Sequence, residues 1–225
     1  MKSYKSILTA VFAFYIVLSF NPNAQAQDFE GIIYFETPSE GSQMGELAYK
    51  IKGSKVRMEM GEGQQSAAII YQPEKSESIV LINQMKAYMK MDMNDEEKAG
   101  QNLEEWENST LDKSGKRKTI AGHSCEIWEV ENENGEKYTL CMAQGLGTFM
   151  TPGNPMNQKN APAWAKMIAR EGYMPLEVIK TDSGTQKVQM RATKIERKSL
   201  DDALFKIPEG YRDMSGMMNK MQKND

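Results

Sequence analysis

The sequence predicts a mainly β protein of the α+β class, in which a strongly curved antiparallel meander forms a half-barrel and a short helix packs on its concave side. Apolar and polar residues alternate with a period of two over most of the chain. Glycine, proline, asparagine and serine separate the alternating segments. About nine or ten strands result, which is too many for an open sheet to stay flat.

The first 26 residues predict the compartment. Lys2 and Lys5 precede an uncharged apolar run at residues 7–20, and a small-x-small pattern ends at Ala26. These are the three parts of a secretory signal peptide cleaved near Ala26. The apolar run is shorter than the roughly 20 residues that a membrane-spanning helix needs. We therefore expect a periplasmic or secreted protein that does not span the membrane.

The mature chain is expected to be acidic and to form one domain. Removing the two lysines of the signal peptide leaves 28 − 2 = 26 basic residues against 31 acidic ones, a net charge of −5. Such a surface is a poor partner for nucleic acid. We expect a single curved-sheet domain at residues 27–213, with a polar insertion at 95–110 and a methionine-rich flexible tail at 214–225.

The expected strands follow one another with short connections. Turn residues at 53–54, 73–74, 83–84, 134–135 and 183–184 favour antiparallel hairpins between neighbours. The alternating segments are residues 28–38, 45–53, 55–63, 66–75, 77–84, 86–94, 123–143 (a hairpin), 173–182 and 185–198.

A short amphipathic helix is expected at residues 161–171. Asn160 is a suitable N-cap and Gly172 a suitable stop. Trp164, Met167 and Ile168 form one bulky apolar stripe at helical spacing. The concave side of an open half-barrel is a natural surface for such a stripe.

The two cysteines, Cys125 and Cys141, flank the expected hairpin. A register that pairs Trp128 with Tyr138 also places the two cysteines opposite each other. In an oxidising compartment this predicts a disulfide. The alternatives are a redox pair, which needs two thiols two residues apart, or a zinc site, which needs four ligands when His123 is the sole histidine.

No catalytic or cofactor motif is present. His123 lies beside Ser124, but the Gly-x-Ser-x-Gly pattern of a nucleophile elbow is missing. The glycine pairs at 61–63 and 145–147 lack the spacing of a phosphate-binding loop. We expect no cofactor, no metal site and no enzymatic activity, with His123 as a turn residue.

The 18 methionines are the most unusual feature of the composition. Within each expected strand they share one parity, and alternation assigns their side chains to the inside of the curved sheet. They are Met58, Met60, Met85, Met89, Met91 and Met93.

Three explanations of these methionines compete. Methionine is an adaptable filler of an ordinary core, and the same adaptability suits a pocket for apolar ligands of varied shape. Thioethers are also good ligands for Cu(I), although no histidine lies nearby. The three explanations stay open at this point.

Four segments resemble the secreted bacterial family called domain of unknown function 4412. They are KIKGSKVRMEM, MKAYMKMDM, KTIAGHSCEIWEV and KIERKSLDDALFKIPEGYRDM. The last segment, with Leu204, Phe205, Ile207, Pro208, Gly210 and Tyr211, also resembles the closing strand and turn of LolA/LppX-like half-barrels, which carry lipoproteins or lipids across the envelope. The resemblance covers about Phe29 to Met214.

The resemblance implies a strongly curved antiparallel sheet with a short helix, such as 161–171, against its concave side. We expect the protein to bind an apolar small molecule, a lipid or an acyl chain there. The alternative is a structural module with an envelope protein as its partner, and a Cu(I)-binding protein is less favoured. The expected wall residues are Met58, Met60, Met85, Met89, Met91 and Met93, with Trp164, Met167 and Ile168 as a lid.

Overall fold

The fold is seen in a computed structural model of the chain. It describes residues 29–37, 46–61, 66–75, 77–92, 109–132, 135–147, 149 and 172–216. The expected signal peptide, the helix at 161–171, most of the polar insertion and most of the tail lie outside the described residues.

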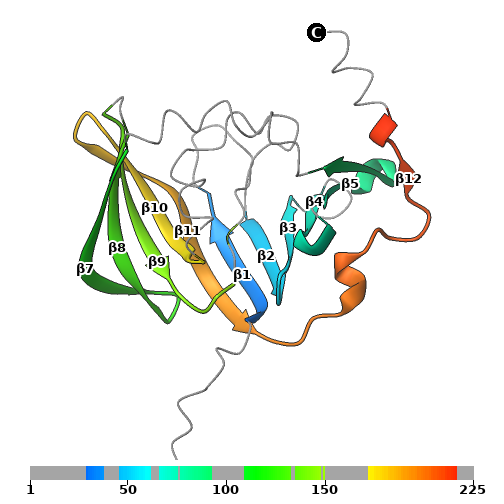
Figure 1. The fold of residues 1–225 in the computed structure, drawn as a ribbon, viewed down its shortest axis with the longest axis horizontal. Helices are drawn as coiled ribbons and strands as arrows, with labels where there is room; N and C mark the ends of the chain where they lie inside the picture. Colours follow the sequence, from blue (N-terminus) through cyan, green and yellow to red (C-terminus); the bar gives the residue numbers. More distant parts are fainter. Residues whose placement is uncertain are drawn as a thin grey trace, which may run out of the picture.

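Within the described residues, twelve strands form one open sheet (Figure 1). The strands are β1 (Glu30–Glu36), β2 (Glu46–Lys52), β3 (Lys55–Met60), β4 (Ala67–Gln72), β5 (Glu77–Ile82), β6 (Ala87–Asp92), β7 (Thr110–Ile120), β8 (His123–Glu131), β9 (Lys137–Ala143), β10 (Met174–Asp182), β11 (Thr185–Arg197) and β12 (Arg212–Asp213). Three short 3-10 helices accompany them: η2 (Pro73–Lys75), η3 (Asn83–Met85) and η6 (Asp202–Phe205). The curved, mainly β class predicted from the sequence is confirmed.

The sheet consists of two meanders that join in its middle. The strand order is β12-β6-β5-β4-β3-β2-β1-β11-β10-β9-β8-β7, and all neighbours are antiparallel except β12 and β6. β1 to β6 run outward to one edge, and β7 to β11 run inward from the other edge. The central contact is therefore β1 against β11, two strands far apart in the sequence.

Two strands were missed by the sequence analysis. β7 carries almost no apolar residues, and most of its side chains are exposed, so it has no alternating pattern. It ends in a turn in which Ala121 and Gly122 both have positive φ, 47° and 79°, as a two-residue hairpin of the I′ type requires. β12 is only two residues long and pairs in parallel with Ala87 and Tyr88 of β6.

Each face of the sheet has its own core. We call the face with Ile33, Tyr49 and Met58 the inner face, because the chain that leaves β9 crosses it to pack on β2. The opposite, outer face carries a second and smaller core that includes Ile70 and Leu81. β-Strand alternation separates the two sets, since neighbouring residues point to opposite faces.

The outer face is covered by the segment 198–214, here called the C-terminal strap. Figure 1 shows it passing from the end of β11 along the outside of the sheet to β12. Leu200 and Phe205 of the strap are 5% and 1% exposed and belong to the same apolar cluster as Ile70 and Leu81. Burial of these side chains is the main stabilising contribution of the strap.

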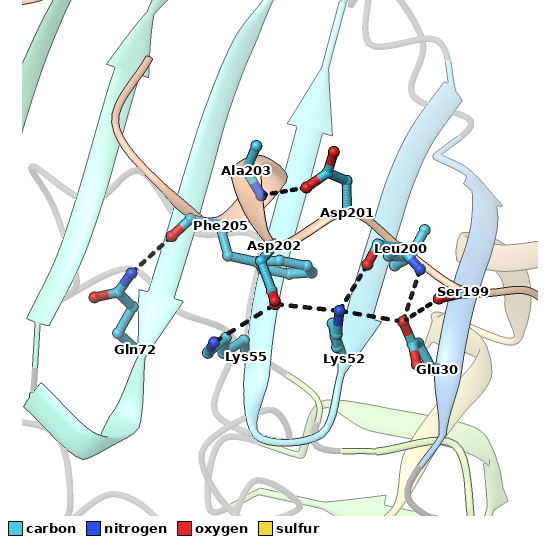
Figure 2. A network of polar contacts seen from close by, with 10 residues as sticks. All are labelled: Glu30, Lys52, Lys55, Gln72, Ser199, Leu200, Asp201, Asp202, Ala203 and Phe205. Carbon is cyan, nitrogen blue, oxygen red and sulfur yellow. Dashed lines mark hydrogen bonds and ion pairs between the residues drawn. The ribbon is translucent and has the colours of Figure 1, made fainter. Parts of the chain in front are cut away.

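Polar contacts fix the position of the strap on the strands (Figure 2). The Lys52 ammonium donates to the Leu200 carbonyl oxygen at 2.7 Å, and the Leu200 amide donates to the Glu30 carboxylate at 2.7 Å. Farther along, the Gln72 side-chain amide donates to the Phe205 carbonyl oxygen at 2.7 Å. These bonds satisfy strap backbone groups that no neighbouring strand can reach.

The charges beneath the strap favour their ionised forms. The Leu200 amide lowers the pKa of the Glu30 carboxyl below its ordinary value, with help from Lys52. The hydrogen bond from Lys52, 3.1 Å away, lowers the pKa of Asp202, and the same bond raises the pKa of Lys52. The ion pairs therefore persist at neutral pH.

The predicted disulfide between Cys125 and Cys141 is confirmed. The register predicted for its hairpin is wrong by two residues, since Ile127 lies opposite Cys141 and the bond runs diagonally to Cys125. The register is set by the loop between β8 and β9. The backbone N–H of Glu136 donates to the Asn132 side-chain oxygen at 2.8 Å, and the backbone N–H of Asn132 donates to the Glu136 carbonyl oxygen at 3.1 Å. This closure sets the pairing of the whole hairpin.

The disulfide lies beneath an ion-pair network on the outer face. Lys118 is the strand partner of Cys125, and Glu177 is the strand partner of both Cys141 and Arg191. The Glu177 carboxylate is 1% exposed; it pairs with the Lys118 ammonium and with the Arg191 guanidinium at 2.7 Å. The contact from Lys118 crosses β8 and β9, so it ties the edge strand β7 to β10.

Replacing both cysteines should destabilise the fold. We expect the double variant C125A/C141A to lose about 2–4 kcal/mol of unfolding free energy, because the denatured chain is no longer cross-linked. Urea titration of the two proteins measures the difference. A reducing agent should lower the stability of the native protein and leave the double variant unchanged; equal stability of the oxidised protein and the variant would contradict the expectation.

The strap can be tested with two adjacent residues. Phe205→Ala should cost about 3–5 kcal/mol, because it empties a buried site on the outer face. Leu204→Ala is the control, since Leu204 is only partly buried, and should cost about 1 kcal/mol. Chemical denaturation gives both values. A similar cost for the two variants would mean that the strap does not depend on the buried ring.

Candidate functional site

The inner face presents rows of apolar side chains across the strands. The pairing of β3, β4, β5 and β6 places Met58, Ile69, Val80 and Met89 in one row. All four are buried, with exposed fractions between 1% and 8%. The alternation of the sequence thus predicted the face of Met58 and Met89 correctly.

Half-buried residues lie on either side of this row. Met60 and Ile82 pack against the inner core on one side, and Tyr71 and Met91 do so on the other side. Each keeps part of its surface accessible to solvent. Four of the six predicted wall methionines, at positions 58, 60, 89 and 91, therefore share the inner face.

Met85 does not lie on this face, and its assignment to the wall is wrong. It ends the 3-10 helix η3 between β5 and β6, and its side chain is 47% exposed. Lys86, with a φ of 45°, then turns the chain into β6. The period of two begins only after this turn, so parity cannot be extended back to Met85.

The remaining predicted ligand-binding residues cannot be placed. Met93 follows the last described residue of β6, and the three lid residues belong to the helix expected at 161–171. All of them, namely Met93, Trp164, Met167 and Ile168, lie outside the described residues.

The pairing separates the methionines of β3 from those of β6. Met58 and Met89 lie three strand spacings apart, about 14 Å at the usual spacing of a sheet. Ile69 and Val80 occupy the positions between them. Met58 and Met89 are therefore too far apart to hold one copper ion, whereas Met89 and Met91 lie on the same face of β6.

No other metal site is seen in the described ranges. There, no group of three or more histidine, cysteine, aspartate or glutamate side chains is arranged to hold a metal ion. His123 lies at the turn between β7 and β8, with its Nδ1 atom 3.2 Å from the Ala121 carbonyl oxygen. The Ser124 hydroxyl accepts a hydrogen bond from Arg117 at 3.0 Å.

Aromatic residues that the sequence analysis did not single out hold the middle of the inner face. Tyr49 packs edge-to-face on Phe35 at 6.2 Å and stacks on Phe149 at 6.0 Å. A side chain at Gly147 would meet Ile51 at 2.8 Å, and its φ is +83°. The close approach of this segment to β2 thus depends on glycine at 147.

The inner face continues without interruption to β8. Trp128, Leu140, Val178 and Met190 form a second row across β8, β9, β10 and β11. Each is at most 3% exposed. The apolar surface therefore extends along the sheet from β6 at one end to β8 at the other.

Polar groups on this face are concentrated near β7, β8 and β9. The Lys113 ammonium lies 4.3 Å from the centre of the Trp128 ring, and the Tyr173 ring lies 4.7 Å from it. On β9, burial raises the pKa of Tyr138, and the Glu136 carboxylate raises it further. Most of the other described side chains on the inner face are apolar, with the buried Ser78 on β5 among the exceptions.

In the part of the chain that the structure describes, none of the helices has the length and apolar composition needed to cross a bilayer.

Comparison with known proteins identifies the family. Residues 29–211 match the model of a domain of unknown function, DUF4412. The chain belongs to the DUF4412 family. The match runs from the start of β1 to the C-terminal strap, so the resemblance predicted from the sequence is confirmed and the strap is part of the family domain. No curated protein matches the chain.

Solved structures that are similar to the chain have low sequence identity to it. PNGF-II in space group C2 has a TM-score of 0.48 and 12% identity, with 84% of this chain and 32% of PNGF-II covered. Its P21 form gives a TM-score of 0.45 and 11% identity, with 85% and 33% covered. MucB gives 0.41 and 12%, with 83% of this chain and 59% of MucB covered. The chain thus spans about a third of PNGF-II and 59% of MucB.

Two methionines test the assignment of faces. Met58→Ala should cost about 2–5 kcal/mol, because Met58 is 1% exposed within the inner core. Met85→Ala should change stability by less than about 0.5 kcal/mol, because its side chain is largely in water. Thermal or chemical denaturation of the two variants compares them directly. A cost at Met85 as large as that at Met58 would contradict the placement of Met85 in an exposed turn.

Proposed function

We propose that this protein is a non-enzymatic binding protein for an apolar ligand or an acyl chain, held on the inner face of the sheet. The observation that carries the proposal is the continuous apolar lining from β6 to β8 on a sheet that remains open. An open sheet of this size presents a broad concave lining, and such surfaces are common sites for small apolar molecules.

The composition of the lining supports a ligand of variable shape. The lining contains Met58, Met60, Met89 and Met91. The unbranched, polarizable side chain of methionine adapts to ligands of irregular shape. The half-buried Met60 and Met91 mark the borders where a ligand would first meet the inner face. A lining made only of rigid β-branched side chains would fit a narrower range of ligand shapes.

The site of action is proposed to be the periplasm or the exterior of the cell. The predicted signal peptide supports export, and the disulfide is typical of an oxidising compartment. A carrier of apolar molecules in such a compartment would shield them from water between membranes.

The proposal is tested with a neutral apolar dye, N-phenyl-1-naphthylamine. The native protein should increase its fluorescence in a saturable manner. Met60→Glu should weaken binding at least tenfold, because it places a charge on the border of the lining, while Met85→Glu should have no effect because Met85 lies in an exposed turn.

Thermal melting of both variants provides the folding control. Native mass spectrometry of the protein isolated from its own envelope should in addition reveal a bound apolar molecule. If the native protein is isolated without a bound apolar molecule and binds no dye, the proposal is wrong. A structural or protein-interaction module of the envelope would then be the better description.

A further inference from the structure

Two hydroxyl groups lie side by side on the inner face of the first meander. Ser78 of β5 is the strand partner of Tyr71 of β4, and Met91 of β6 lies on the other side of Ser78. Tyr71 and Met91 pack against the inner core, so Ser78 points to the same face. Directly paired residues have Cβ atoms about 4.5–5.5 Å apart, so both side chains can contact one bound molecule. We call Ser78 and Tyr71 the hydroxyl pair.

The hydroxyl pair has unused hydrogen-bonding capacity. Ser78 is 2% exposed, yet within the described part of the chain neither its Oγ atom nor the Tyr71 hydroxyl forms a hydrogen bond. Buried hydroxyl groups of native proteins are nearly always paired. A polar atom from a bound molecule would therefore be stabilising at this position.

The pair can be reached from solvent. The fully enclosed polar atoms that lack a partner in the described residues are Gln72 Oε1, Ser109 Oγ and Trp128 Nε1. The Ser78 Oγ atom also lacks a partner there and is not one of them, so it keeps a small contact with solvent. Tyr71 and Met91 on either side are only half-buried. A ligand can approach the Ser78 hydroxyl between these two side chains.

The surroundings of the pair are uncharged. In the described strands β2 to β6, no inner-face position carries a charged side chain, and the polar ones are Tyr49, Tyr71 and Ser78. The cations that contact inner-face rings, on β7, β10 and β11, belong to the other meander. A charged head group at the pair would lose its hydration without gaining an opposite charge, whereas an uncharged oxygen needs only the hydrogen bonds that hydroxyls supply.

We infer that the ligand of the inner face is an uncharged amphiphile, whose hydroxyl or ester oxygen hydrogen-bonds to Ser78 and Tyr71 and whose hydrocarbon chain lies along the neighbouring apolar row. That row contains Ile69 and Val80, which are two residues from Tyr71 and Ser78 on the same strands, and it ends at Met58 and Met89. The inference rests on the proposed function and specifies its ligand class.

The test measures displacement of bound N-phenyl-1-naphthylamine by compounds that share one chain length. The compounds are 1-decanol, methyl decanoate, ionised decanoate and 1-chlorodecane, which has no hydrogen-bonding head of comparable strength. Ser78→Ala and Tyr71→Phe should each raise the concentration of 1-decanol needed for half displacement about fivefold, because one hydrogen bond is lost. Both variants should leave displacement by 1-chlorodecane unchanged. A loss with methyl decanoate as well would show that an ester oxygen is accepted in addition to a hydroxyl.

Two matched variants serve as controls. Tyr34→Phe removes a hydroxyl from the outer face, and Ser124→Ala removes one from an exposed position on β8. Neither should alter displacement by any of the compounds. Thermal melting checks folding, and Ser78→Ala should not lower the melting temperature, because its hydroxyl has no partner in the described part of the chain.

The outcomes separate this inference from the proposed function. If the native protein binds the dye but Ser78→Ala and Tyr71→Phe leave displacement by the alcohol and the ester unchanged, the hydroxyl pair is not the head-group site and the proposed function stands. An equal loss for 1-decanol and 1-chlorodecane would make the pair part of the apolar wall, which contradicts the inference. Decanoate that displaces the dye as effectively as 1-decanol would contradict an uncharged head group. If the native protein binds no dye, the proposed function fails and the inference fails with it.

Discussion

The antiparallel contact between β1 and β11 holds the molecule together. It joins the first meander to the second, and every other strand is attached to the sheet through one of these two. The contact requires glycine at position 31, because a Cβ atom there would lie 2.0 Å from the carbonyl oxygen of Glu196. Arg197, the strand partner of Gly31, places its guanidinium 5.0 Å from the centre of the Phe29 ring and so closes the start of β1. Without this contact neither meander would have a complete inner face, since each contributes only part of the apolar lining.

The two faces of the sheet are stabilised in different ways. On the outer side of β1 to β6, charged residues such as Arg57 and Glu59 lie among apolar ones, and the strap covers both by combining the buried Phe205 ring with hydrogen bonds to its backbone carbonyl groups. The Arg57 guanidinium, for example, donates to the Leu204 carbonyl oxygen at 2.9 Å and to Glu59 at 2.7 Å. The inner side has few such partners to offer. Its stabilisation therefore comes chiefly from burial of apolar surface.

Much of the fold followed from alternation alone, and the failures have physical causes. Ten of the strands have one apolar face, and this pattern gave their positions and the orientation of Met58 and Met89. β7 has no apolar face because it is an edge strand, so the same rule could not find it. The register of the Cys125–Cys141 hairpin depended on how Asn132 closes the loop, which is a side-chain hydrogen bond and leaves no trace in hydrophobic periodicity. Met85 was misplaced because a 3-10 turn interrupts the period.

The bare edge at β7 has a consequence for how the protein behaves in a crowded solution. An open sheet can polymerise by adding strand to strand through an unpaired edge. In β7, a bulge around Gly115 interrupts the ladder. The exposed Lys116 and Arg117, next to the bulge, add positive charge to this edge. Electrostatic repulsion and a broken ladder together discourage fibril growth from this side, while β12 shortens the free edge of β6 on the other. The sheet can therefore stay open, with a broad apolar inner face, while its edges disfavour strand pairing with other copies.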